Sequence, residues 1–268
     1  MRLMKIFDNH VHLSRQSLDY FHRTFTRAGG TGINLVNLTE DCLSTDSFAK
    51  KYEETISISG LLKERGLDVV TTIGPYPVNL LEMIREVELE RAISIYREAV
   101  DIAIKLIEEG RADAIGEVGR PHFETDSKVV AGSNAVMEYI FQRSADKNIP
   151  VILHTESLDS RGMCEIMNMA EKNGKRSLVV KHFSAPIFSD NCGIIPSVPA
   201  SRKNARSAPW GKEGFFLETD FAGDESNPNF VLPADSVPKR INMLLQEGVE
   251  GEKIEKSMEF YKRFYGLE

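Results

Sequence analysis

Two histidines one residue apart, His10 and His12, end the first apolar run of the chain, Ile6 to His12. In an extended strand the side chains of residues i and i+2 point to the same face, so these two imidazoles are expected to converge. Imidazole nitrogen is a common ligand of zinc and other divalent metals, and two convergent rings need one or two further ligands to complete a site. Alone, the pair also fits two edge-strand or core histidines, so the rest of the chain must decide.

Four more ionisable residues stand at the C-terminal tips of later apolar runs. Glu117 ends Ala114-Ile115-Gly116-Glu117, and His154, His182 and Asp220 end three further runs in the same way. Isolated in a protein core, four imidazoles and two carboxylates would each need a partner to replace water. Brought together they would form a shell for two divalent ions.

The elements that must position these residues follow from the alternation of short β-rich runs with longer stretches of helical period. We expect eight strands: 6–12, 33–38, 68–74, 114–118, 150–154, 178–182, 193–198 and 214–220. Between them, apolar residues from Tyr96 to Ile107 recur at helical spacing, and Gly110 supplies a stop. We also expect one helix after Pro238 and another that carries Ile254, Met258 and Tyr261 on one face.

Several of these strands are apolar on both faces, as a covered parallel sheet requires. Eight strands alternating with helices in 268 residues predict one α/β domain over 1–268, a (β/α)₈ TIM barrel, with an open doubly wound sheet as the alternative. In a barrel the C-terminal strand tips meet at one face, where catalytic residues collect. The six residues His10, His12, Glu117, His154, His182 and Asp220 are therefore predicted to form one metal site.

Composition narrows the class of protein. The formal net charge of −7 disfavours a large nucleic-acid-binding surface. No run of 18 apolar residues is present, and Met1 to Lys5 leads into a strand rather than a signal sequence, so a cytoplasmic protein without a membrane partner is expected. Three cysteines, Cys42, Cys164 and Cys192, are an odd number at unrelated spacings and are expected to be reduced and structural.

Five segments together resemble the successive signatures of the TatD family of metal-dependent hydrolases, within the amidohydrolase superfamily. They are Asp8-Asn9-His10-Val11-His12-Leu13, residues 114–119, 151–155 and 181–184, and Leu217-Glu218-Thr219-Asp220. The resemblance implies a barrel with two divalent metals and deoxyribonuclease or related phosphodiesterase chemistry. It also implies that His10, His12 and Asp220 bind one metal, that His154 and His182 bind the other, and that Glu117 bridges them. Asp220 would then take the proton from the attacking water.

The loops differ from those of better-known family members. Gly119-Arg120-Pro121-His122-Phe123 replaces the usual Gly-Leu-Asp-Tyr, and Glu156 stands where those members have an arginine. Residues 221–229 replace a short proline-containing turn, and the familiar Arg-Asn-Glu-Pro near the end is missing. These departures resemble a divergent, largely archaeal-type branch. They weaken the prediction of a phosphodiester substrate more than the prediction of a hydrolase.

Other residues favour a substrate that contains a phosphate group. A basic segment follows the seventh strand, and with its single tryptophan it is expected on the active face, where it could hold a phosphate and stack a base: Arg202, Lys203, Arg206, Trp210 and Lys212. An ordinary solvated loop, with Trp210 as a packing anchor, fits equally well. Arg120 and His122 are candidates for substrate contact. The alternative for each is a hydrogen bond to a residue of the site, without contact with the substrate, or a position on the surface. His22 is expected to be structural.

Ligand type leaves the metal open: zinc is the first choice, and manganese, magnesium, nickel and iron also fit mixed imidazole and carboxylate shells. The substrate is expected to be a small molecule or an oligonucleotide carrying a phosphoester. A lactone or cyclic amide of a small metabolite is the alternative substrate, and a metal-binding barrel without catalysis is the alternative from another class. Any exposed helix of the outer layer could mediate homo-oligomer formation.

Overall fold

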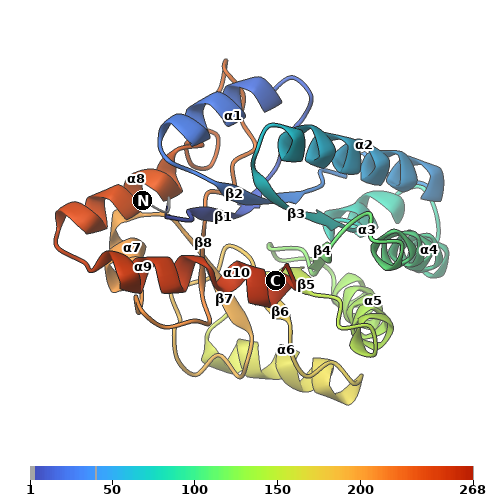
Figure 1. Ribbon diagram of the computed structural model, residues 1–268. Coiled ribbons are helices and arrows are strands. Elements are labelled where there is room, and N and C mark those ends of the chain that lie inside the picture. The colour runs from blue at the N-terminus through green and yellow to red at the C-terminus, as the bar shows by residue number, and fades with distance from the viewer. Residues whose placement is uncertain (1–3, 40, 268) are drawn as a thin grey trace.

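The fold is an eight-stranded parallel barrel surrounded by helices (Figure 1). It is seen in a computed structural model that describes residues 4–39 and 41–267; Met1 to Leu3, the start of the segment expected to lack a signal sequence, lie outside the described residues. The strands are β1 (Phe7–Val11), β2 (Gly32–Val36), β3 (Asp68–Ile73), β4 (Ala114–Gly119), β5 (Val151–His154), β6 (Val179–Lys181), β7 (Ile195–Pro199) and β8 (Phe216–Glu218). The helices are α1 (Leu18–Arg27), α2 (Thr45–Glu64), α3 (Val78–Met83), α4 (Leu89–Glu108), α5 (Ser127–Ala145), α6 (Ser160–Lys172), α7 (Arg202–Ser207), α8 (Ser236–Gln246), α9 (Gly251–Met258) and α10 (Phe260–Tyr265).

Each predicted strand run overlaps one observed strand, and the strands pair in chain order from β1 to β8. The first and last strands also meet. Asp220 N donates to His10 O at 2.9 Å, and His12 N donates to Phe221 O at 2.7 Å. These bonds close the ring, so the (β/α)₈ barrel is confirmed and the open sheet is excluded.

Buried apolar faces and helix caps account for the outer layer. The predicted apolar stripe of α4 is buried, including Tyr96, Val100 and Ile104, and Gly110 follows its end with a φ of 72°. A capping box between Ser44 and Ser47 begins α2. The packed helices fix the positions of the strands. The loops that follow the strands at the C-terminal face are therefore held in place at their first residues.

The C-terminal helices differ from the prediction in two respects. Helix α8 begins before Pro238, at Ser236, because a proline in the first helical turn sacrifices no intrahelical hydrogen bond. The expected last helix is two: Ile254 and Met258 belong to α9, whereas Tyr261 lies in α10. Figure 1 shows α8 at the left of the molecule, followed by α9 and α10, which lead across the front to the C-terminus.

Helix α10 packs on the N-terminal end of the barrel. Its aromatic residues form one apolar cluster with residues near the starts of several strands, including Phe7, Ala114 and Phe216. The rings of Phe7 and Tyr261 stack with centroids 3.9 Å apart. This end of the barrel is therefore filled by side chains, and the open face is the opposite one.

The cysteine prediction is wrong for two of the three residues. Cys164 of α6 and Cys192, just before β7, form a disulfide across 28 positions of sequence, whereas Cys42 is free and buried. Spacing along the chain could not indicate this pair, because the barrel brings α6 and the β6–β7 connection side by side. In the part of the chain that the structure describes, no helix is long and apolar enough to span a membrane.

Candidate metal centre

All six predicted ligands converge at the C-terminal face, around the carboxylate of Glu117. Its Oε1 lies 3.0 Å from His182 Nε2, 3.1 Å from His154 Nδ1 and 3.3 Å from His10 Nε2. Glu117 comes from β4, His10 from β1 and His154 from β5, while His182 directly follows β6. The parallel order of the strands explains why side chains up to 172 positions apart in the sequence lie close together at one face of the barrel.

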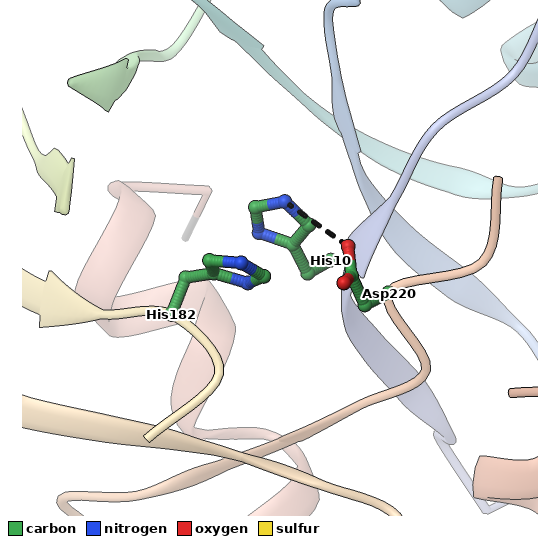
Figure 2. Close-up of side chains that lie close together, drawn as sticks. All are labelled: His10, His182 and Asp220. Carbon is green, nitrogen blue, oxygen red and sulfur yellow. Dashed lines mark ion pairs between the residues drawn. The ribbon is translucent and has the colours of Figure 1, made fainter. Parts of the chain in front are cut away.

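The His-x-His pair converges as the strand geometry predicts. His10 Nε2 and His12 Nε2 lie 3.2 Å apart. Asp220 Oδ1 lies 3.4 Å from His12 Nε2 and 3.9 Å from His10 Nε2. Figure 2 shows His10 between Asp220 and His182, and the two imidazole rings stack with centroids 3.8 Å apart. Among the described residues, three overlapping groups have the proximity that a metal ion needs: His10, His12 and Glu117; His10, His182 and Asp220; and Glu117, His154 and His182.

The buried imidazoles and carboxylates of this cluster need a bound cation to balance their charge and hydrogen-bonding demands. His10, His12, Glu117 and His182 are buried. The Nδ1 atom of His10 has no hydrogen-bond partner, and its Nε2 faces both another ring nitrogen and two carboxylates. One proton cannot serve all of these contacts, whereas a divalent cation accepts several nitrogen and oxygen ligands at once. The donor set therefore fits a divalent metal centre.

Burial and the neighbouring charges also shift the pKa values of these groups. Burial opposes the charge on Glu117, but the imidazoles of His182, His10 and His154 hold its pKa well below the usual range. Burial and the neighbouring His10 ring hold the pKa of His182 well below its ordinary value. Burial alone would lower the pKa of His12, but the carboxylates of Asp220 and Glu117 raise it to about 9. A neutral His182 and an ionised Glu117 are the forms that bind a cation.

Three of the four imidazoles, those of His12, His182 and His154, have a second contact on the ring nitrogen that faces away from the cluster. His12 Nδ1 lies 3.0 Å from the carbonyl oxygen of Val36, to which it can only donate, so its Nε2 is the nitrogen left for the cluster. His182 Nδ1 lies 3.0 Å from Glu218 Oε1, although the ring is not aligned for a full hydrogen bond. His154 Nε2 lies 2.8 Å from His122 Nδ1 and 3.4 Å from the hydroxyl of Tyr76.

The cluster opens into a cavity of about 160 Å³. Its wall consists of five of the ligand residues and seven others, from the loops after β2, β3 and β8: His12, Asn37, Leu38, Thr39, Tyr76, Glu117, His154, His182, Asp220, Ala222, Phe230 and Val231. No lysine or arginine is among these described residues. Two exposed apolar side chains, Phe230 and Val231, border the entrance.

The other predicted substrate contacts have different surroundings. Arg120 forms an ion pair with Glu156 at 2.6 Å, which joins the loops after β4 and β5. Its backbone N donates to His154 O at 2.9 Å, an approach that depends on Gly119, whose φ is 136° and whose position leaves no room for a side chain beside His154 O. His122 lies against His154 rather than on the cavity wall.

The basic segment after β7 does not line the cavity. Arg206 pairs with Glu247 at 2.5 Å on the outer surface, and the indole of Trp210 donates to Ala205 O and packs against Phe215. Arg202 and Lys203 begin α7 beside them. A role of these four residues in substrate binding stays a prediction.

Comparison with known proteins shows which family the chain belongs to. The model of the family described as TatD related DNase matches residues 7–265. The chain belongs to the TatD family. This TatD protein is 28% identical to the uncharacterised protein MJ1127 of Methanocaldococcus jannaschii over 263 residues, which cover 94% of this chain and 92% of the relative.

Two solved structures share the fold of this TatD protein. YjjV, a TatD homologue from Escherichia coli, superposes with a TM-score of 0.67 at 15% identity and covers 98% of both chains. The phosphotriesterase homology protein of Escherichia coli superposes with a TM-score of 0.64 at 13% identity, over 99% of this chain and 100% of that one. Family membership and the buried cluster together make this TatD protein a metal-dependent hydrolase that binds divalent metal.

Sequence reasoning missed the residues that orient the ligands. Glu218 and Asp8 stand inside the family-like segments but received no role, and Tyr76 follows β3 without any recognisable motif. Glu218 is fully buried, and burial raises its pKa to about 7. A buried carboxylate two positions before a ligand was the available signal for Glu218; no comparable signal exists for Tyr76.

Proposed function

We propose that this TatD protein is a two-metal phosphoesterase, a deoxyribonuclease-like phosphodiesterase that hydrolyses its substrate with an activated water. The observation that carries the proposal is the approach of three imidazoles to Glu117 Oε1, with a fourth imidazole and Asp220 beside it. His10, His12 and Asp220 would hold one cation and His154 and His182 the other, with Glu117 shared. Zinc is the first choice, since imidazole and carboxylate ligands both suit it.

Bound divalent cations supply acidification of a water molecule and polarisation of the scissile group. The protein's own contribution is orientation and proton transfer. Asp220, about a fifth exposed at its side chain and facing the cavity, is the general base that accepts the proton of the attacking water. Glu117 and the four histidines lie on strand ends that the closed barrel holds rigidly, so the reacting groups are positioned before substrate arrives.

Two observations support a phosphoester substrate. The family is described by its relation to deoxyribonucleases, and the phosphotriesterase homology protein, which has the same fold, is described with phosphate in its active site. Because no lysine or arginine is among the described residues of the cavity wall, the charge of a phosphate would be balanced by the cations. A small molecule or a short single-stranded end therefore fits better than an extended duplex.

One observation favours a second candidate. Arg120, in the loop after β4, is paired with Glu156, and no lysine or arginine among the described residues lines the cavity to bind a phosphate. An uncharged substrate, such as a lactone or a cyclic amide, would bind such a cavity without the need to balance the negative charge of a phosphate. The same water chemistry would hydrolyse it. A cytoplasmic location and association into homo-oligomers also stay proposals.

The experiment that separates these candidates is a substrate screen of the metal-loaded protein beside a chelator-treated sample. Bis-p-nitrophenyl phosphate and single-stranded DNA test the first candidate, and panels of lactones and dihydropyrimidines test the second. We expect metal-dependent cleavage of the phosphodiesters. Cleavage confined to lactones or cyclic amides would overturn the phosphoester proposal. Tight metal binding without turnover on any panel would instead indicate a metal-binding barrel without catalysis.

A further inference from the structure

A chain of hydrogen bonds between buried side chains crosses the interior of the barrel from β3, through the C-terminal helix α10, to the metal centre. Its steps run from Thr72 Oγ1 to Asn34 Oδ1 (2.6 Å), from Asn34 Nδ2 to Tyr265 Oη (3.3 Å), from Tyr265 Oη to Asn9 Oδ1 (2.9 Å), from Asn9 Nδ2 to Ser197 Oγ (3.0 Å), and from Ser197 Oγ to Glu218 Oε2. All of these side chains are buried. The chain therefore joins five strands and α10 through buried side chains.

Every step of this chain donates in the same direction, toward Glu218. Each amide and hydroxyl after Thr72 accepts from one neighbour and donates to the next, so no member is left unpaired. Hydrogen bonds arranged in this way polarise one another in a medium of low dielectric constant. The loss of any one donor would leave a buried acceptor unpaired and allow its neighbours to move.

The chain ends beside a metal ligand. Glu218 Oε1 accepts from Phe183 N at 2.7 Å, which anchors the backbone that follows His182. The same oxygen lies 3.0 Å from His182 Nδ1. The negative charge of a carboxylate beside Nδ1 favours the tautomer with its proton on that nitrogen, which leaves Nε2 free, and His182 Nε2 is the atom that lies 3.0 Å from Glu117 Oε1.

We propose that Tyr265 is a positioning residue for the metal ligand His182 and acts through Asn9, Ser197 and Glu218. Tyr265 holds Asn9, Asn9 orients the hydroxyl of Ser197, and Ser197 fixes the Glu218 carboxylate against the His182 ring. The metal centre thus depends on α10, which packs on the opposite end of the barrel. The inference rests on the metal centre of the proposed function but not on its substrate.

The same helix offers a matched control. Tyr261 is also a buried tyrosine of α10, but its hydroxyl donates to Asp68 Oδ2 at 2.7 Å, outside the chain that leads to Glu218. Tyr265→Phe and Tyr261→Phe each remove one hydroxyl from a packed ring. Both variants should lose some stability, but only Tyr265→Phe should affect the metal.

The test is titration of the metal-free full-length protein with Co²⁺, recording affinity and the visible absorption spectrum. We expect Glu218→Gln to weaken one Co²⁺ site by about 10–100-fold, the usual effect of removing such a partner of a ligating histidine. Tyr265→Phe should weaken the same site several-fold and shift its spectrum, and Tyr261→Phe should match the wild type. The double variant should bind no more weakly than Glu218→Gln alone, since both changes act along one path.

Equal Co²⁺ affinity and spectra for Tyr265→Phe and Tyr261→Phe would overturn the inference, whatever their stabilities. If Glu218→Gln fails to fold, the comparison of the two tyrosine variants decides alone. Absence of Co²⁺ binding by the wild type would overturn the metal centre and this inference together. Normal Co²⁺ binding without phosphoester hydrolysis would contradict only the proposed substrate, and the tyrosine comparison would still decide the inference.

Discussion

At the scale of single residues, the two carboxylates of the centre have different surroundings. Both line the cavity, but Glu117 is enclosed by three imidazoles within 3.3 Å of one oxygen and its side chain is 7% exposed, whereas Asp220 contacts His12 and its side chain is 19% exposed. An enclosed carboxylate suits a shared metal ligand. A more exposed carboxylate can also exchange a proton with a water molecule next to the substrate.

Asp220→Asn tests this division of roles. The amide keeps the size of the side chain but cannot accept the proton, so kcat should fall by about 10²–10⁴-fold, the usual range for loss of a general base. Steady-state kinetics on the best substrate of the screen, with metal content measured in parallel, check the prediction. Normal kcat in a fully metal-loaded variant would contradict the role of Asp220 as base.

Residue types at strand tips were sufficient to predict that the six side chains converge, because a parallel barrel brings all such tips to one face. The residues that orient them could not be predicted in this way. The contact between Tyr265 and Asn9 joins residues 256 positions apart, and it depends on how α10 packs on the barrel. His122 was a candidate for substrate contact or for a second hydrogen-bonding role; its Nδ1 lies 2.8 Å from His154 Nε2, a contact set by the path of the loop after Gly119, and substrate contact stays a prediction.

At the scale of elements, the connections between strands carry features that local sequence does not indicate. The eight strands and the apolar stripe of α4 follow from periodicity, and each was predicted. The disulfide and the break between α9 and α10 depend on packing between separate elements, and both predictions were wrong. The disulfide links α6 to the connection between β6 and β7.

Cys164→Ser tests the contribution of this link to stability. Closing a loop across 28 positions removes entropy from the unfolded chain, so the variant should lose about 3–4 kcal/mol of unfolding free energy. Urea denaturation measures the loss. Dithiothreitol should reduce the stability of the wild type by a similar amount and leave the variant unchanged; equal stability of wild type and variant under oxidising conditions would contradict the prediction.

Lys175, in the connection between α6 and β6, gives a prediction for pH. Its amine is buried and donates to Ile149 O at 2.6 Å, and burial lowers its pKa to about 8. Between pH 8 and about 10.4, the unfolded value for lysine, the unfolded chain binds more protons than the folded protein, so this residue makes stability rise with pH. The unfolding free energy of the wild type, relative to Lys175→Met, should increase from pH 8 to pH 10. A constant difference would show that Lys175 is not buried as an amine.

At the scale of the whole molecule, the first and last strands must meet for Asp220 to lie beside His10 and His12. Asp8 provides the side-chain link: its Oδ1 accepts from Thr219 N at 2.9 Å and its Oδ2 from Thr219 Oγ1 at 2.7 Å, 211 positions away. Both residues are fully buried. The closure positions Asp220 directly beside the His10 backbone.

Thr219→Val removes the hydroxyl while keeping the shape of the side chain. It leaves one oxygen of Asp8 without its donor in the core, which should cost about 1–3 kcal/mol of unfolding free energy. Chemical denaturation followed by circular dichroism measures this loss. An unchanged midpoint and slope would mean that the link between Asp8 and Thr219 contributes nothing to closure of the barrel.

The central claim is that the six residues at the C-terminal face form a metal centre on which hydrolysis depends. The most direct measurement is the metal content per chain of the wild type and of His154→Ala, with His22→Ala as a control on α1, each assayed before and after chelation. We predict two divalent ions and chelator-sensitive turnover in the wild type and in His22→Ala, and loss of one ion together with turnover in His154→Ala. Full metal content and normal turnover in His154→Ala, or turnover that survives complete metal removal in the wild type, would contradict the claim.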